Sequence, residues 1–295
     1  MAAAAILVVL WLGLSYVVAC RLTHRAAPPF PEPIPPGAWS DLQALRLRTS
    51  DGLDIGAWCL DGGAQAPVAL LLHAHGSSRT GMLGLMRLWA GMGCNVMSVS
   101  LRGHGDSGGE LDDFGYSARF DVAAALAEIR RRHPQSPIII HGISLGSAAA
   151  VFAAKDAGLE VRGYILDCPF RDLYTAVRHR TSIYLPPVCD WAAYEGLCVV
   201  APLVLPQPGA ISPVDHIQDI APDTPILLLA GSRDRHAPPK DVEELFHLVE
   251  GHARYELRNA RHTLLCVDDA AGYEGHLREF LQQVAPEAIV AGHPR

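Results

Sequence analysis

The sequence lacks any excess of positive charge, since its 295 residues carry a formal net charge of −7. A protein that binds nucleic acid needs a basic surface, so the composition argues against a nucleic-acid partner. The seven cysteines form no C-x-x-C pair and no cysteine–histidine zinc spacing, so we expect no structural metal. Cys189 and Cys198 are close enough in sequence to pair, but only in an oxidising compartment.

The composition of a disordered chain is also absent. Hydrophobic residues make up 49% of the sequence and charged residues 19%, which is typical of a chain that folds around a core. The length allows one large α/β domain or two small ones. We find no internal repeat.

Positive charge is missing before the apolar segment at the amino end, where a secretory signal would carry it. Ala2 to Cys20 is almost wholly apolar, and about 20 such residues can cross a bilayer core. Arg21, His24 and Arg25 follow directly. By the positive-inside rule, residues 1–25 are expected to be a single-pass anchor with the rest of the protein in the cytoplasm.

Two other interpretations of this segment stay open. Val17-Val18-Ala19 could precede a cleavage site, and together with Cys20 it resembles a lipoprotein box, so export is the alternative. Residues 26–38 are rich in proline and predict an extended linker. Residues 39–290 are then expected to form the folded domain.

Strand-like and helix-like segments alternate along this domain. The expected strands lie at 43–48, 53–60, 68–72, 95–101, 136–140, 161–166, 225–230 and 255–257. The expected helices lie at 82–92, 120–129, 146–154, 241–249 and 273–284. This order predicts an α/β fold with a mostly parallel sheet covered on both faces.

The alternation stops between residues 171 and 223. Apolar residues continue there without a clear core period, and several prolines interrupt them. A long insertion in a compact domain is more often a lid or binding element than a plain connection. We therefore expect a lid at 171–223.

The segment Gly142-Ile143-Ser144-Leu145-Gly146 has the pattern G-x-S-x-G. An apolar strand precedes it and a run of small residues typical of a helix follows it. This is the context of a nucleophile elbow, in which a strained turn exposes a serine hydroxyl above a sheet. The two glycines would let strand and helix approach closely. The pattern predicts Ser144 as a nucleophile.

Together these features resemble the α/β-hydrolase superfamily, and within it the branch of esterases, lipases, thioesterases and serine-aminopeptidase-like hydrolases. The resemblance covers about Trp39 to Val284. It rests on the segments 73–77, 101–107 and 142–146 and on the loops that contain Asp234 and His262. In this superfamily the catalytic residues follow the chain order serine, acid, histidine.

The resemblance implies that His262 is the base and Asp234 the acid. His262 follows the last short strand, whereas His252 lies in a turn and His276 lies inside a helical pattern. Asp234 follows the strand at 225–230. Its rival is Asp167, because a few members of the superfamily place the acid after the earlier strand.

The oxyanion of a tetrahedral intermediate needs two N–H donors. Leu145, which follows the nucleophile, is expected to supply one, and by resemblance Ser77 supplies the other. His73-Ala74-His75 could suggest a metal pair, but no later ligand follows in register, so we expect neither a metal nor a cofactor.

We therefore expect a serine hydrolase that cleaves an ester or thioester through an acyl-serine intermediate. The apolar insertion and the anchor favour a lipophilic acyl substrate. A peptidase of the serine-aminopeptidase type is the first alternative, although no acidic cluster is evident to hold a peptide amino terminus. A non-catalytic scaffold is the second, and the complete set of Ser144, Asp234 and His262 argues against it.

Overall fold

An eight-stranded sheet forms the centre of the protein in the computed structural model, which describes residues 1–26, 28–157 and 161–286. The strand order is β1-β2-β4-β3-β5-β6-β7-β8. Every pairing is parallel except the two made by β2. The strands are β1 (Gln43–Arg48), β2 (Asp54–Leu60), β3 (Val68–Leu72), β4 (Asn95–Val99), β5 (Ile138–Ile143), β6 (Val161–Asp167), β7 (Ile226–Gly231) and β8 (Ala253–Arg258).

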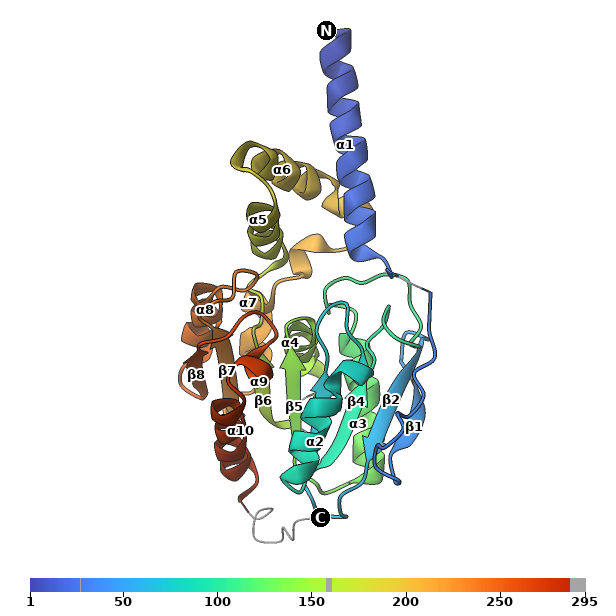
Figure 1. Ribbon diagram of the computed structural model, residues 1–295, viewed down its shortest axis with the longest axis vertical. Coiled ribbons are helices and arrows are strands. Elements are labelled where there is room, and N and C mark those ends of the chain that lie inside the picture. The colour runs from blue at the N-terminus through green and yellow to red at the C-terminus, as the bar shows by residue number, and fades with distance from the viewer. Residues whose placement is uncertain (27, 158–160, 287–295) are drawn as a thin grey trace.

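Helices cover both faces of the sheet (Figure 1). The helices α3 (Arg119–Arg132), α4 (Leu145–Ala157) and α8 (Pro239–Val249) pack on one face, and α2 (Leu83–Gly91) and α10 (Ala270–Val284) pack on the other. Alternate residues of the fully buried β3 supply the two cores, Leu70 and Leu72 to the first and Leu71 to the second. This alternation is the two-residue period of a strand. The predicted fold class is confirmed.

The segment 171–223 folds into helices at one end of the sheet (Figure 1). Its elements are α5 (Leu173–Tyr184), α6 (Pro187–Val204), α7 (Pro213–His216) and two short 3-10 turns, Pro208–Ala210 and Ile217–Asp219. Further short helices are the 3-10 turn Arg79–Met82 and α9 (Leu265–Asp268). Because α6 buries few residues, its sequence shows no core period.

The N-terminal helix α1 (Ala2–Thr23) projects away from the sheet and packs beside α6 (Figure 1). Both helices are long and apolar enough to cross a membrane. The Trp11 Nε1–H donates to the Ala192 carbonyl at 2.9 Å. A Cβ at Gly196 would overlap the Ser15 hydroxyl, so a small residue is required where the helices meet. The apolar N-terminal helix that the sequence predicts is confirmed.

The proline-rich segment contacts the folded domain. The Glu32 carboxylate is buried, and it lies 2.9 Å from the Arg79 guanidinium and 2.6 Å from the Ser100 hydroxyl. Just before the segment, Arg25 donates to the carbonyls of Gly105, Ser107 and Gly109. The segment was expected to be an extended linker, but it forms hydrogen bonds and an ion pair with the folded domain. The predicted domain end at residue 290 lies outside the described residues.

Candidate active site

Ser144 occupies the turn between β5 and α4, with its backbone in the left-handed region at φ 51°. A Cβ at Gly142 would overlap the backbone of Gly146, and a Cβ at Gly146 would overlap the Leu72 carbonyl. The strand, the turn and the helix can therefore meet only where these positions are glycine. The Ser144 N–H donates to the Asp167 carbonyl at 2.8 Å, which fixes the turn against β6.

The structure brings Ser144, His262 and Asp234 into one chain of hydrogen bonds. The Ser144 Oγ lies 3.1 Å from His262 Nε2, and His262 Nδ1 lies 2.6 Å from Asp234 Oδ2. The three residues follow three different strands, β5, β8 and β7, at the carboxyl edge of the parallel sheet. Ligands of open α/β sheets bind at this edge.

Asp234 is well placed to remain ionised. Its side chain is fully buried, and its Oδ1 accepts the N–H groups of His236 at 2.8 Å and Ala237 at 2.9 Å. Burial acts to raise the pKa of Asp234, but the His262 bond and the two backbone bonds outweigh it and lower the pKa below its usual value. A carboxylate held in this way can orient the histidine and stabilise its charged form.

Asp167, the rival acid, bonds elsewhere. The Tyr273 hydroxyl donates to its Oδ2, and His141 Nε2 lies 3.4 Å from the same oxygen. The backbone carbonyl of Asp167 accepts from Ser144 and from the Ser147 hydroxyl at 3.0 Å. Asp167 therefore supports the elbow through its backbone and lies in a buried polar network through its side chain.

The two rival histidines do not contact Ser144. His276 is on α10, where its ring lies against Arg254 and Arg258 of β8. His252 Nε2 is buried without a hydrogen-bond partner among the described residues, and its backbone carbonyl accepts from Ile226. Among the described histidines, only His262 lies within hydrogen-bond distance of the Ser144 hydroxyl.

The two expected oxyanion donors differ in whether their N–H groups already donate to another acceptor. Leu145 is the first residue of α4, so its N–H has no acceptor within the helix. The Ser77 N–H already donates to the Ala74 carbonyl at 3.1 Å. The neighbouring His75 N–H has no acceptor among the described residues. Backbone donors leave no side-chain signature, so the sequence could not separate these two positions.

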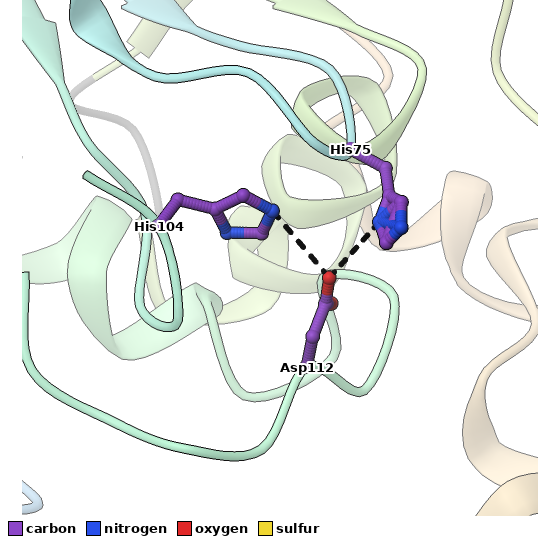
Figure 2. A group of neighbouring side chains, drawn as sticks. All are labelled: His75, His104 and Asp112. Atoms are coloured by element: carbon purple, nitrogen blue, oxygen red, sulfur yellow. Dashed lines mark hydrogen bonds and ion pairs between the residues drawn. The ribbon is translucent and has the colours of Figure 1, made fainter. Parts of the chain in front are cut away.

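A second histidine–aspartate cluster lies on neighbouring loops at this edge, and Figure 2 shows His75 and His104 converging on Asp112. The Asp112 Oδ2 lies 3.1 Å from His75 Nδ1 and 3.5 Å from His104 Nε2. The sequence does not reveal this arrangement, because Asp112 is distant in sequence from His75 and follows a different strand, β4.

The cluster has the donor set of a zinc site, but protein groups already occupy it. The Gly76 N–H donates to His104 Nε2 at 3.2 Å, and the Phe114 N–H donates to Asp112 Oδ1 at 3.0 Å. These contacts join the loop after β3 to the loop between β4 and α3. In a second possible ligand group, Cys168 lies near Asp234 and His262, and burial raises the pKa of the Cys168 thiol well above its usual value.

Known proteins of similar sequence include hydrolases. Residues 64–193 match the family model described as serine aminopeptidase, S33. The chain is 27% identical to the uncharacterised protein YqkD of Bacillus subtilis over 68% of this chain and 67% of that protein. It is 29% identical to the lysophosphatidylserine lipase ABHD12 of Xenopus tropicalis over 52% of this chain and 42% of that protein.

Solved structures share the fold. An esterase of Pyrococcus furiosus, Pf2001, superposes with a TM-score of 0.71 and 20% identity, covering 87% of this chain and 98% of the esterase. The chain therefore has the α/β-hydrolase fold.

Proposed function

We propose that this protein is a serine hydrolase that cleaves a carboxylic ester or thioester with a lipophilic acyl group. The observation that carries the proposal is the continuous hydrogen-bond chain from the Ser144 hydroxyl through His262 to the buried Asp234. An aliphatic hydroxyl is a weak nucleophile until an adjacent base takes its proton, and this chain supplies the base and its orienting acid.

In the proposed reaction, Ser144 Oγ attacks the acyl carbonyl carbon while its proton passes to His262 Nε2. The carbonyl π bond breaks and its electrons move to the oxygen, which becomes an oxyanion. As the intermediate collapses, the bond to the leaving alkoxide or thiolate breaks and His262 gives that group its proton. Water then attacks the acyl-serine with the same help from His262, which releases the acid and restores the Ser144 hydroxyl.

For the oxyanion we propose the N–H groups of Leu145 and His75. Leu145 begins α4, and the positive end of that helix dipole favours the developing negative charge. Ser77, the position suggested by resemblance, would first have to break its bond to Ala74. The His75 N–H needs no such change.

We further propose that the protein associates with a membrane through α1 and α6 together. Helix α1 of 22 residues is about 33 Å long, close to the thickness of a bilayer core. Its contact with α6 at Ser15 lies about 9 Å from Arg21, on the apolar side of the basic end. If α1 spans the bilayer, α6 must therefore enter the nearer leaflet.

The outer face of α6 suits that position. Val188, Trp191, Val199 and Leu203 are exposed there, by 80%, 61%, 56% and 72% of their surfaces. Glu195 lies in the same stripe, and its carboxylate would keep the helix near the headgroups instead of deep in the hydrocarbon. A membrane at this face would present lipid-like esters beside the helical insertion.

A substrate panel tests the reaction. Purified protein is given matched esters, acyl thioesters and aminoacyl amides, with Ser144→Ala as the control. The proposal expects hydrolysis of esters or thioesters that requires Ser144. Preferential release of amino acids would establish the peptidase alternative, and inactivity toward all three classes would favour the scaffold.

Vesicle flotation and protease protection test the membrane proposal. Trp191→Asp should weaken binding of the protein to neutral phosphatidylcholine vesicles, whereas Leu257→Asp, at another exposed apolar position, should not. Equal binding by both variants would refute the role of α6. The basic residues Arg21 and Arg25, at the end of α1, predict a cytoplasmic domain, so external protease should leave that domain intact in whole cells. Its digestion would support export.

A further inference from the structure

The last turn of α5 lies over the proposed base. The Tyr184 hydroxyl, at the end of this helix, lies 3.4 Å from His236 Nε2. The His236 ring in turn lies against His262, with 5.2 Å between the ring centroids. A chain of side-chain contacts therefore joins α5 to the reacting histidine.

Arg180 lies on the same face of α5 as Tyr184, because residues four apart on a helix are neighbours. Its one hydrogen bond within the described residues runs from Nη1 to the Ala176 carbonyl at 3.3 Å. No described carboxylate lies within ion-pair distance of it, although Arg178 on the same helix pairs with Asp190 at 3.0 Å. Arg180 thus brings an unpaired positive charge to the site.

The electrostatics of neighbouring groups place this charge near the proposed triad. Arg180 helps to lower the pKa values of His75 and His236, for both of which burial is the largest cause. Burial also lowers the pKa of Arg180 itself, while Tyr184 and Asp234 act to raise it. Asp234 cannot serve as its partner, because His262 and two backbone N–H groups already occupy the carboxylate.

A partly buried guanidinium without a counter-ion is costly, and it retains several donors in a planar fork. That fork matches a carboxylate or a phosphate. We propose that Arg180 binds an anionic group of the substrate, a carboxylate or phosphate carried by the ester that Ser144 attacks. The inference rests on the proposed function and narrows its substrate class to anionic esters.

The same charge bears on the peptidase alternative. An aminopeptidase must hold a substrate ammonium group near the scissile bond, and Arg180 would repel it. The anion could lie on either side of the ester, because the structure places Arg180 near the base and not along a defined substrate. The experiment therefore includes an arm for each side.

The test compares matched neutral and anionic esters with the full-length protein and with Arg180→Gln. For the alcohol side, the pair is a 1-monoacylglycerol and the 3-phosphate with the same acyl chain. For the acyl side, it is the 4-nitrophenyl esters of butyric acid and of glutaric acid. Lys240→Gln removes one positive charge at a side chain that is 83% exposed, so it controls for net charge.

In at least one arm, Arg180→Gln should raise KM for the anionic ester by about tenfold to a hundredfold, as expected for the loss of a charge-assisted hydrogen bond. The kcat for that ester, and both constants for its neutral partner, should change by less than about threefold. Arg180→Lys should restore part of the affinity, and Lys240→Gln should behave like the natural protein.

Three results would overturn the inference. One is an equal loss with neutral and anionic esters, and another is no loss with either. The third is a large drop in Tm for Arg180→Gln, because removal of an unpaired buried charge should leave stability unchanged or increase it. If the natural protein hydrolyses neither member of either pair, the proposed function fails instead.

Discussion

Two histidine–aspartate pairs lie on loops at the carboxyl edge of the same sheet, and only one of the two is hydrogen-bonded to a serine hydroxyl. His262 Nδ1 lies 2.6 Å from Asp234, and His262 Nε2 faces the Ser144 hydroxyl. His75 Nδ1 lies 3.1 Å from Asp112, but His75 Nε2 faces no hydrogen-bonding group among the described residues.

The two pairs also differ in how much their histidine side chains are exposed. The His262 side chain is 18% exposed and the His75 side chain is 42% exposed. A histidine–carboxylate contact therefore occurs in this protein both with and without a serine hydroxyl on the second ring nitrogen. What distinguishes the first pair is that its second ring nitrogen is aimed at a hydroxyl on a strained turn.

The largest expected effect on kcat comes from breaking the link between the first pair and Ser144. Ser144→Ala and His262→Ala should each lower kcat by about a thousandfold or more, and the double variant should lose little beyond either, because such residues act as a unit. Steady-state kinetics with the preferred ester give the comparison. Near-normal turnover by His262→Ala would show that His262 is not the base.

The next effect compares the two aspartates directly. Asp234→Asn should lower kcat by about a hundredfold or more, because an amide cannot hold the productive histidine tautomer. Asp112→Asn should lower kcat by about tenfold at most, since Asp112 touches no reacting atom and acts only through the position of His75. Circular dichroism spectra should show that both variants are folded. A larger loss in Asp112→Asn would reverse the roles of the pairs.

His73, which lies near the second pair, should make the stability of the protein depend on pH. Burial lowers the pKa of His73 to about 3. Because an unfolded histidine titrates near 6.5, the unfolded state binds more protons below that pH. The stability from neutral His73 is therefore complete above pH 6.5 and is lost as the pH falls toward 3, by about 2 kcal/mol between pH 6.5 and 4.5.

Urea unfolding at several pH values measures this dependence. His73→Gln removes the titrating group, so its unfolding free energy should fall less steeply than that of the natural protein between pH 6.5 and 4.5. His75, whose pKa burial also lowers, should leave a residual slope in the variant. Parallel slopes for the two proteins would show that His73 is not held neutral by the fold.

The smallest expected effect concerns the rival acid. Asp167→Asn retains an oxygen that can accept the Tyr273 hydroxyl, and its Oδ1 has no partner in the described structure. The kcat should therefore stay within about threefold of the natural value. A loss greater than that of Asp234→Asn in the same assay would move the catalytic acid to Asp167.

The sequence predicted the sheet more fully than the insertion. The continuous apolar run of β3 is buried on both faces, so composition alone identified it. Helix α6 was missed as a helix because its partner is α1, which is distant in sequence, and because its outer face is exposed. A pattern search for one buried face finds no period in such a helix.

The residues of the candidate site also include some that the sequence predicted and some that it did not. Ser144 and its glycines were predictable because the close approach of Gly146 to Leu72 imposes a residue type. The contact of Asp112 with His75 and the position of Arg180 near His236 were not, because only the fold brings those segments together. The helical spacing of Arg180 and Tyr184 was a usable signal, but it gives no indication of what α5 faces.

The most direct test of the central claim is reaction with a fluorophosphonate probe, followed by peptide mapping by mass spectrometry. The account predicts one adduct, on Ser144, that is absent in Ser144→Ala and forms far more slowly in His262→Ala than in Asp112→Asn. Labelling of another residue, or undiminished labelling of Ser144→Ala, would contradict the claim that Ser144 is the activated nucleophile of this protein.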